Sequence, residues 1–194
     1  MPSKFFAFLD RMKLIDRWAL MRNTTTEDVA QHTMQVAMIA HALCTIENTL
    51  FGGNFDADKA AVMALYHESA EVVTGDLPTP VKYYDDNINK AYKNIERRAE
   101  QKLIDTLPDE LKNAFSPYVQ TDKKSAEYKL VKRADKMSAL IKCVEELAVH
   151  NVEFENAYAA TKAELDAAPE KSVAYFMEVF LPAYSMSLDN LLDR

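Results

Sequence analysis

The sequence predicts an all-α fold. Only 3 of its 194 residues are glycine and 7 are proline, so the residues that most often interrupt helices are scarce. Apolar residues recur every three or four positions along most of the chain, which is the spacing of one helix face. Hydrophobic residues make up 48% of the sequence, enough for a sizeable core. Because there are no repeats, low-complexity tracts or convincing linkers, we expect one domain over residues 1–194.

Two helices are predicted at the start of the chain. The first covers residues 4–15 and is amphipathic, with Ser3 as its N-cap. The second covers residues 27–48 and follows the segment 24–28, which reads Thr-Thr-Thr-Glu-Asp. Hydroxyl side chains suit an N-cap, and acidic side chains suit the positive end of the helix dipole. This segment therefore predicts a well-defined helix start.

A third helix is predicted over residues 57–73, with Asp56 as its N-cap. Gly75 suits the position just past a helix end, because glycine adopts positive φ without strain. The next segment, residues 76–80, reads Asp-Leu-Pro-Thr-Pro. Proline lacks the backbone N–H that a helix interior needs, so we expect no helix in this segment.

The rest of the chain predicts further helices by the same criteria. Apolar stripes mark the longer ones, and Pro108 suits the first turn of a short one. Residues 120–124 are polar and predict a loop. The helical spans that we expect are 83–107, a short helix from 108, 125–150, 152–167, 170–180, and one more turn in the tail 182–194.

Composition limits the classes of function. The formal net charge of −7 weighs against a nucleic-acid partner, which needs a basic surface, but it allows a small anionic substrate. Charged residues interrupt the apolar N-terminal segment, so we expect no signal peptide. No apolar run approaches the ~20 residues of a membrane span, so we expect no membrane partner. Cys44 and Cys143 lie on separate predicted helices and indicate free buried thiols in a reducing cytoplasm.

Polar residues near the end of the third predicted helix indicate a metal site. Glu71 is four residues after His67 and three after Glu68, so it shares a face with each. His67 and Glu68 diverge by roughly 100° about the axis, but both can reach an ion that sits off the helix end. Imidazole nitrogen and carboxylate oxygen together suit Zn, Mn, Co or Fe, whereas Mg prefers oxygen alone. Two ligands do not hold such an ion, so other segments must contribute.

His32 and Asp135 are the candidates for the missing ligands. Asp135 lies close to the apolar face of its predicted helix, where an unpaired carboxylate costs several kcal/mol that a metal would remove. The alternative for Asp135 is a surface ion pair with the neighbouring basic residues. His41 is nine residues after His32, about half a turn round the axis, so the two cannot bind one ion from a straight helix. We interpret His41 as a satisfied core or surface residue.

Arg17 lies beside Trp18, the only tryptophan in the chain. Two interpretations of this pair remain open. Trp18 can close the core beside an exposed Arg17. Alternatively, Arg17 can bind a phosphate beside an aromatic wall, a role that suits the planar guanidinium.

The order His32, His67-Glu68 and Asp135 on three predicted helices resembles the HD-domain metal phosphohydrolases. Their pattern is a His on one helix, a His-Asp pair ending another, and a distant Asp. The segments RMKLIDRW, LMRN and EVVTGDLPTPVKY are similar to those of the bacterial 5′-deoxynucleotidase family, and the likeness covers nearly the whole chain. It implies a single HD-type helical bundle over residues 1–194 that forms a homodimer. It also implies hydrolysis of deoxyribonucleoside 5′-monophosphates to deoxynucleoside and phosphate, with Co, Mn, Cu or else Zn as the divalent cation.

The resemblance also implies roles for individual residues. The implied metal ligands are His32, His67, Glu68 and Asp135. Arg17 would orient the phosphate, and Trp18 would form a wall against the sugar. Glu71 and Asp76 would handle protons. The residues implied to border the substrate are Arg17, Trp18, His32, His67, Asp76, Leu77, Pro78, Thr79 and Asp135.

The implied reaction is metal-assisted hydrolysis. Arg17 would hold the phosphate by a bidentate contact. Either Asp76 or Glu71, as a protonated carboxyl, would give its proton to the leaving 5′-oxygen. A ribose 2′-hydroxyl would clash with Trp18 and Asp76 or lose hydrogen bonds there, which gives selectivity for deoxyribose.

Position 68 departs from the family pattern, because Glu68 stands where the pattern has Asp. The extra methylene moves the carboxylate oxygen by roughly 1.5 Å. The metal can shift, Glu68 can bind through water, or the site can bind weakly, and a misplacement of about 1 Å costs on the order of 100-fold in rate. A nucleotide-binding HD-domain protein with weakened catalysis is therefore the alternative to an active enzyme.

Two other classes of hydrolase fit the sequence less well. The spacing from His67 to Glu71 is similar to the HExxH motif of metalloproteases, but the second histidine and a suitable third ligand are missing from the sequence. A nucleotide hydrolase that binds Mg through carboxylates alone would leave the histidines without a role.

Overall fold

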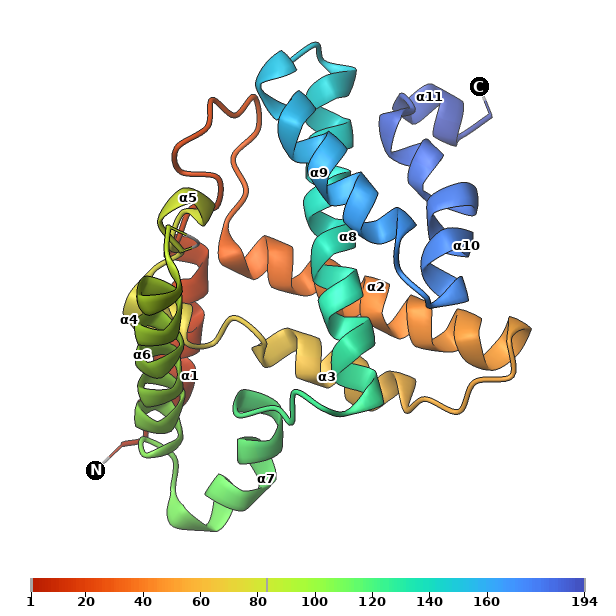
Figure 1. Ribbon diagram of the computed structural model, residues 1–194. Helices are drawn as coiled ribbons and strands as arrows, with labels where there is room; N and C mark the ends of the chain where they lie inside the picture. The colour runs from red at the N-terminus through yellow and green to blue at the C-terminus, as the bar shows by residue number, and fades with distance from the viewer. Residues whose placement is uncertain (1, 83, 194) are drawn as a thin grey trace.

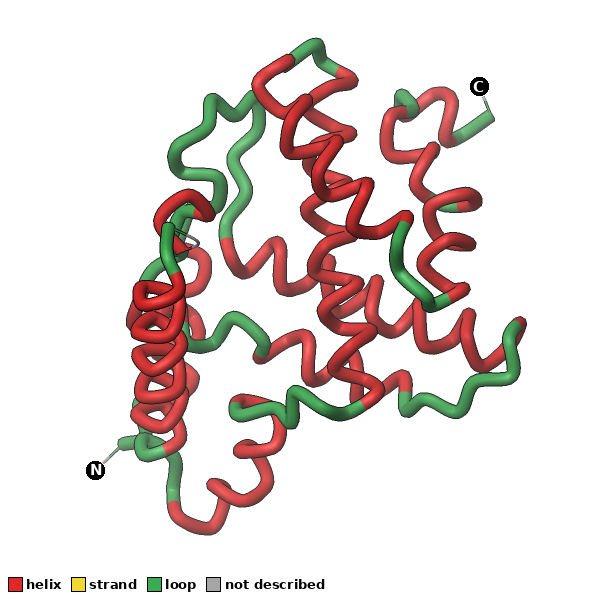
Figure 2. The backbone as a smooth tube through the Cα atoms, viewed as in Figure 1, coloured by secondary structure: helices red, strands yellow, loops and turns green. Residues whose placement is uncertain are grey.

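The computed structural model describes residues 2–82 and 84–193. Within them the fold is all-helical, with no strand beyond one isolated bridge between Asp16 and Asp28, which confirms the predicted fold class (Figures 1 and 2). No helix among these residues is both long and apolar enough to cross a membrane. The elements in chain order are α1 (Phe5–Leu9), the 3-10 helix η1 (Asp10–Leu14), α2 (Val29–Leu50), α3 (Ala57–Tyr66), α4 (Glu71–Thr74), α5 (Thr79–Lys82), α6 (Asp86–Ile104), α7 (Asp109–Val119), α8 (Ala126–Ala148), η2 (Val152–Phe154), α9 (Glu155–Asp166), α10 (Lys171–Val179), η3 (Leu181–Ser185) and α11 (Leu188–Leu191).

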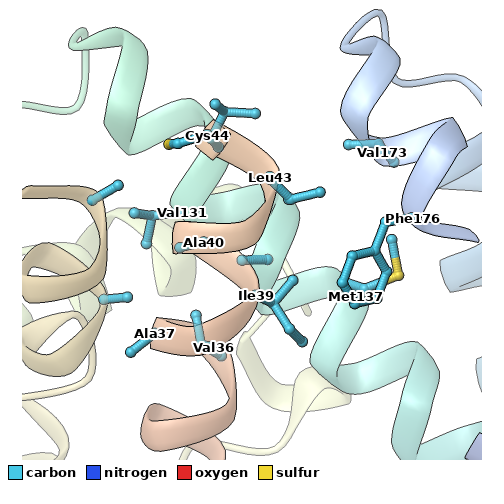
Figure 3. Packing of buried hydrophobic residues seen from close by; sticks show 14 of the residues in the cluster. Val36, Ala37, Ile39, Ala40, Leu43, Cys44, Val131, Met137, Val173 and Phe176 are labelled. Atoms are coloured by element: carbon cyan, nitrogen blue, oxygen red, sulfur yellow. The ribbon is translucent and has the colours of Figure 1, made fainter. Parts of the chain in front are cut away.

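The main core lies where α8 packs across α2 and α3 (Figure 1). Their apolar faces form one buried cluster, which α10 closes on the far side of α2. Figure 3 shows Ile39 of α2 pointing toward Phe176 of α10 and Met137 of α8. Each buried side chain of this size contributes about 1.5–3 kcal/mol. The three helices that carry or precede the candidate ligands are therefore fixed relative to one another by close packing.

The start of α2 is set by Asp28 and not by the threonines before it. The Asp28 carboxylate accepts a hydrogen bond from the backbone N–H of Gln31 at 2.8 Å, and the Gln31 side chain accepts one from the N–H of Asp28 at 3.1 Å. This reciprocal capping box satisfies two donors at once. The threonine hydroxyls that we expected as caps are therefore not needed, and α2 begins at Val29 instead of residue 27.

The third predicted helix, residues 57–73, is interrupted in the structure. It ends as α3 at Tyr66, residues 67–70 form a turn, and α4 begins at Glu71. Gly75 follows α4 with a φ of 71°, as expected for a residue just past a helix end.

The interruption arises at the carbonyl group of Ala64. In a continuing α-helix this carbonyl would accept from the N–H of Glu68. It accepts instead from the N–H of His67 at 3.3 Å, and the His67 ring nitrogen Nδ1 lies 2.6 Å from it. The side chain and backbone of His67 thus occupy the acceptor that would continue the helix.

The prediction that residues 76–80 are non-helical is wrong for the last two of them. Thr79 and Pro80 begin α5, which forms one helical turn. The backbone N–H groups of Val81 and Lys82 donate to the carbonyl of Pro78 at 2.9 and 3.0 Å. Pro80 lies in the first turn, where N–H groups have no partner within the helix in any case. Proline is therefore compatible with this position.

The remaining predicted helices are confirmed with shifts at their ends. The helix expected over 83–107 begins later as α6, because Asp85 caps it by accepting from the N–H groups two and three residues on. Tyr83 lies outside the described residues. The tail contains two turns, η3 and α11, where one was expected. The expected helix over 4–15 divides into α1 and η1.

A smaller core lies beside the main one and joins α1, α6 and α7. Phe5 is fully buried in it, with its ring edge-on to Phe115 of α7 at a centroid separation of 5.4 Å. Figure 2 shows α1, α4, α5 and α6 gathered along one side of the molecule, and α6 contacts each of the other three. This cluster supports the segment that follows His67 and Glu68.

The loop between η1 and α2 is anchored to α8 by Glu146. The Glu146 carboxylate is only 1% exposed and accepts from the backbone N–H of Thr24 at 3.0 Å, its hydroxyl at 2.7 Å and the amide of Asn151 at 2.8 Å. It also pairs with Lys142 one turn earlier. Burial alone would raise the pKa of Glu146, but the hydrogen bonds from Lys142, Asn151 and Thr24 outweigh it and lower the pKa to about 2.

We expect Glu146→Ala to lower the free energy of unfolding at pH 7 by about 3–5 kcal/mol, because it leaves Lys142 buried without its partner. Urea denaturation followed by circular dichroism measures this change. Glu145→Ala removes the same group from an exposed neighbour on α8 and should change stability by less than about 0.5 kcal/mol. Equal stability of the two variants would contradict the anchoring role.

The stability difference between wild type and Glu146→Ala should also depend on pH. Because the folded pKa of Glu146 is depressed, its stabilisation is present above the ordinary value of 4.5 and is lost as the pH falls toward about 2. The stability difference between wild type and Glu146→Ala should therefore shrink across that interval. A difference that stays constant from pH 6 to the folded pKa would show that the carboxylate charge is not responsible.

Candidate active site

Four side chains from three parts of the chain converge on one point. His32 of α2, His67 and Glu68 of the turn after α3, and Asp135 of α8 each offer one ligand atom, and these atoms all lie within 4.8 Å of one another. His32 Nε2 and Asp135 Oδ1 are 3.2 Å apart, as are His67 Nε2 and Glu68 Oε1. Two ligands at about 2.1 Å from a tetrahedral ion are about 3.4 Å apart, so the cluster matches the size of a metal site.

The turn after α3 is what brings His67 and Glu68 to the same side. On a continuous helix these adjacent side chains would diverge by roughly 100°. The helix ends at Tyr66, and both residues belong to the turn that follows. The extra reach of Glu68 places its oxygen beside the His67 ring nitrogen.

Hydrogen bonds on the far side of each imidazole fix its protonation. The Ser138 hydroxyl donates to Gln35 at 2.6 Å, so it accepts from His32 Nδ1, 2.9 Å away. The Nδ1 of His67 faces the carbonyl of Ala64, which can only accept. Both rings therefore carry a proton on Nδ1 and direct Nε2 into the cluster, as in metal-binding histidines.

The two Nε2 atoms are buried, and within the described part of the chain neither has a hydrogen-bond donor. Burial lowers the pKa of His32, which favours the neutral ring. Burial alone would also lower the pKa of His67, but the adjacent Glu68 carboxylate and then Asp135 outweigh it and raise the pKa. A neutral nitrogen lone pair that faces the Asp135 carboxylate at 3.2 Å is unfavourable unless a cation lies between them. The arrangement thus fits a bound metal ion.

Asp135 is held in its charged form by a second basic residue. Its Oδ2 pairs with the ammonium of Lys132, one turn earlier on α8. Burial alone would raise the pKa of Asp135, but Lys132 and then the two histidines hold it well below its usual range. The carboxylate is therefore ionised and able to bind a cation through Oδ1.

Arg17 and Trp18 lie on the loop that precedes α2, and both are held by Glu27. The Glu27 Oε2 atom accepts from the indole Nε1 of Trp18 at 2.7 Å and from Arg17 Nε at 3.3 Å. Burial alone would lower the pKa of Arg17, but nearby carboxylates, Glu27 first, outweigh it and raise the pKa. The other carboxylates that act on Arg17 are Asp135, Glu68 and Asp76. The guanidinium is therefore within electrostatic reach of the cluster.

Two further acids face the same region from α4 and the segment after it. Glu71 is only 6% exposed, and its Oε2 has no hydrogen-bond partner among the described residues. Burial, followed by repulsion from Glu68 and Asp76, raises its pKa to about 9. Burial also raises the pKa of Asp76. Glu71 is thus protonated at neutral pH in the absence of a nearby cation.

A model of the family described as "5′-deoxynucleotidase YfbR-like" matches residues 4–184 of this sequence. The chain belongs to this family. It is 52% identical to the 5′-deoxynucleotidase YfbR of Escherichia coli O127:H6 over 97% of this chain and 96% of that protein. It is 51% identical, with the same coverage, to the protein of that name from Shigella boydii serotype 18.

Solved structures place this YfbR-like chain in the HD-domain phosphohydrolase fold. An HD-domain phosphohydrolase from Listeria innocua superimposes with a TM-score of 0.81 at 23% identity, covering 93% of this chain and 88% of that one. The cyanophage S-2L HD phosphohydrolase DatZ, whose structure holds dA and one catalytic Zn²⁺ ion, superimposes with a TM-score of 0.61 at 18% identity, covering 94% and 99%. The resemblance inferred from the sequence motifs is confirmed.

The other residues singled out in the sequence lie outside the four-residue cluster. Leu77 and Pro78 are half-buried between α4 and α5, and the side chain of Thr79 lies outside the described part of the structure. His41 is exposed, with its Nε2 3.6 Å from Asp58, and it takes no part in the cluster. Cys44 and Cys143 are both buried and unpaired within the described residues.

The ion pair of Asp135 with a neighbouring basic residue, which the sequence offered as an alternative, is present with Lys132. Sequence reasoning missed three other residues at the site: Glu27 contacts the Arg17–Trp18 pair, Ser138 contacts His32, and Gln35 accepts from Ser138. Helical spacing offered a signal for two of them. Ser138 lies three residues after Asp135 and Gln35 three after His32, so each shares a face with a candidate ligand.

We expect Ser138→Ala to weaken metal binding by about 10- to 100-fold, because the His32 ring loses the partner that fixes its orientation. Titration of metal-free protein with Co²⁺ or Mn²⁺ measures the affinity. Ser172→Ala is the matched control, since Ser172 is a fully buried serine of α10 whose hydroxyl has no partner among the described residues. Equal affinities in the two variants would rule out the role assigned to Ser138.

Proposed function

We propose that this protein is a metal-dependent 5′-deoxynucleotidase that converts deoxyribonucleoside 5′-monophosphates to deoxynucleoside and phosphate. Its family and its YfbR relatives support the reaction class. The observation that carries the proposal is the four-residue cluster, in which the Nε2 atoms of two buried imidazoles, neither with a hydrogen-bond partner among the described residues, meet one oxygen from each of two carboxylates. Such a set of nitrogen and oxygen donors suits a divalent cation.

We propose that His32, His67, Glu68 and Asp135 bind this cation. Two nitrogen and two oxygen donors favour Co, Mn, Cu or Zn over Mg. When bound, the ion neutralises charge on phosphate oxygens and makes a water molecule more acidic. The structure of DatZ, which holds one catalytic Zn²⁺ ion, supports a divalent metal in this fold.

Arg17 is proposed to bind the phosphate group. Among the described residues its only acceptor is Glu27, through Nε, so the terminal nitrogens are those that can form the bidentate contact. Trp18 and Asp76 are proposed to border the sugar, where a 2′-hydroxyl would meet the indole ring and an acid. The nucleotide would also contact Leu77, Pro78 and Thr79 and lie beside His32, His67 and Asp135.

Glu71 is proposed as the general acid. Water attacks phosphorus, the P–O5′ bond breaks, and the carboxyl of Glu71 gives its proton to the leaving 5′-oxygen. The raised pKa and the unpartnered Oε2 of Glu71 support this role over Asp76, whose pKa is also raised. A proton from the attacking water restores Glu71 to its protonated form.

The wider setting is also a proposal. We propose that residues 1–194 act as one HD-type unit, that two copies form a homodimer, and that the protein works in the cytoplasm on free nucleotides. The net charge of −7 supports a small substrate over a nucleic acid.

A nucleotide-binding protein with weakened catalysis is the second candidate, because Glu68 replaces the Asp of the family pattern. Against it, Glu68 Oε1 lies 3.2 Å from His67 Nε2, a spacing that two ligands of one ion adopt. The longer side chain therefore reaches the cluster, and we favour the active enzyme.

Phosphate release from dAMP in the presence of Co²⁺ or Mn²⁺ tests the function. We expect turnover of dAMP to exceed that of AMP and 3′-dAMP, because only the 2′-hydroxyl is excluded by the proposed sugar wall while the 5′-phosphate position is kept. AMP is the control for the sugar, and 2′-deoxyadenosine 3′-monophosphate (3′-dAMP) is the control for the position of the phosphate. Equal turnover of AMP and dAMP would indicate a general phosphatase instead.

Glu68→Asp separates the two candidates. If Glu68 is a working ligand, the variant and the wild type should hold equal metal, measured by elemental analysis, and turn over dAMP at rates that differ by only a few-fold. Turnover that appears only in the Asp form would favour the weakened binder.

Glu71→Gln should lower kcat by about 10²- to 10⁴-fold with metal content unchanged, because the amide cannot donate the proton. In the wild type the rate should fall as the pH rises through the pKa of Glu71. That pKa is raised to about 9 without a cation, and a bound cation would bring it down from this value. The pH profile of the variant should lack this descending limb. A limb that persists in Glu71→Gln would assign the acid to another residue.

A further inference from the structure

We propose that Glu27 is a positioning residue that sets both the phosphate clamp and the sugar wall. This inference rests on the proposed function, because Arg17 and Trp18 are the residues proposed to contact the nucleotide. Glu27 itself lies behind them on the same loop and is not assigned to the substrate.

One oxygen of Glu27 holds both side chains. Oε2 accepts from Trp18 Nε1 at 2.7 Å and from Arg17 Nε at 3.3 Å. The Glu27 and Arg17 side chains are each only 13% exposed, so these are charge-assisted bonds with little competition from water. A shift of this oxygen would move the guanidinium and the indole together.

The backbone of Trp18 gives a second, independent observation. Its φ is 58°, a left-handed conformation that costs a non-glycine residue roughly 1–2 kcal/mol. The conformation is maintained by neighbours: the Trp18 carbonyl accepts from the N–H of Met21 at 2.8 Å and from the amide of Asn23 at 3.2 Å. Strain of this kind persists where the surrounding structure fixes a side chain for function. Here it directs the indole N–H onto Glu27 while the ring packs on Phe154, with centroids 5.4 Å apart.

The loop keeps its shape without the Glu27 side chain. Its base is closed by two backbone hydrogen bonds, from Arg17 N to Glu27 O at 2.9 Å and from Val29 N to Ile15 O at 3.0 Å. Its tip is held by Glu146 of α8. A substitution at Glu27 therefore changes the side-chain contacts and leaves these backbone anchors in place.

Glu27 also lies close to the metal ligands without joining them. Its Oε1 is 3.9 Å from Nδ1 of His32, the nitrogen that faces away from the metal cluster and is bound to Ser138. Any effect of a Glu27 variant that runs through His32 would appear in metal content. Metal analysis thus separates that route from the positioning of Arg17 and Trp18.

Two substitutions of Glu27 distinguish its two contacts. Glu27→Gln keeps a side-chain oxygen for the indole N–H but loses the charge that pairs with Arg17. Glu27→Ala loses both. Glu153→Gln is the matched control, since Glu153 contacts the same loop through Arg22 on the exposed side.

Four measurements apply to each variant as purified holoenzyme. Fluorescence emission reports directly on Trp18, because it is the only tryptophan in the chain. Steady-state kinetics with dAMP and AMP report on phosphate binding and on sugar selectivity. Metal analysis and thermal melting report on integrity.

We expect Glu27→Ala to shift the emission of Trp18, to raise KM for dAMP by about 10- to 100-fold with a smaller change in kcat, and to reduce the preference for dAMP over AMP. Glu27→Gln should raise KM while it retains most of the emission and the sugar preference. Glu153→Gln should match the wild type in every measurement.

Unchanged emission and unchanged KM in Glu27→Ala would overturn the proposal. It would also be overturned if Glu27→Ala lost metal or melted early without a change in emission or in the dAMP preference, because Glu27 would then be structural only. Failure of the proposed function is distinct, since it would appear as no turnover of any deoxynucleotide by the wild type. The emission shift still tests the position of Trp18 in that case.

Discussion

The site depends on the charge balance of two carboxylates and two imidazoles placed around one point. The Nε2 atoms of His32 and His67 and one oxygen each of Glu68 and Asp135 meet in a largely buried space, while Nδ1 of each ring is bound elsewhere. Two carboxylate charges at this separation are unfavourable unless positive charge balances them, and Lys132 supplies part of it through Asp135. The packed core of α2, α3 and α8 holds the four groups in place. A cation at their centre would supply the remaining positive charge.

The chemistry of the site divides between a rigid core and a loop. The candidate metal ligands come from α2, α8 and the turn after α3, whereas Arg17 and Trp18 come from an irregular segment whose backbone is anchored at its base and at its tip. Glu27 links the two parts, because its carboxylate touches both loop side chains and approaches His32. A loop of this kind can contribute to a preorganised site, since its shape is set by hydrogen bonds and not by sequence-local propensity.

The fold class was predictable because helical spacing located the apolar faces. His67, Glu68 and Asp135 stood out as polar groups near those faces without a structural need, whereas the complete ligand set with His32 was implied by the resemblance to the HD-domain pattern. The interruption of the third helix at Tyr66 was not predictable, since it depends on the His67 ring occupying the carbonyl of Ala64. Contacts such as Ser138 with His32, more than 100 residues apart, arise only when α8 packs on α2. Glu27 escaped notice for a similar reason: a charged residue in a polar run has no distinctive pattern until its partner is known.

The anchoring of the η1–α2 loop to α8 has a consequence for how this architecture can diverge. Asp135 and Glu146 both lie on α8, so one candidate ligand and the anchor of the loop that carries Arg17 share a single helix. The guanidinium therefore keeps its register with Asp135 wherever α8 packs. The bundle around that helix recurs in HD-domain structures that share fewer than a quarter of their residues with this chain.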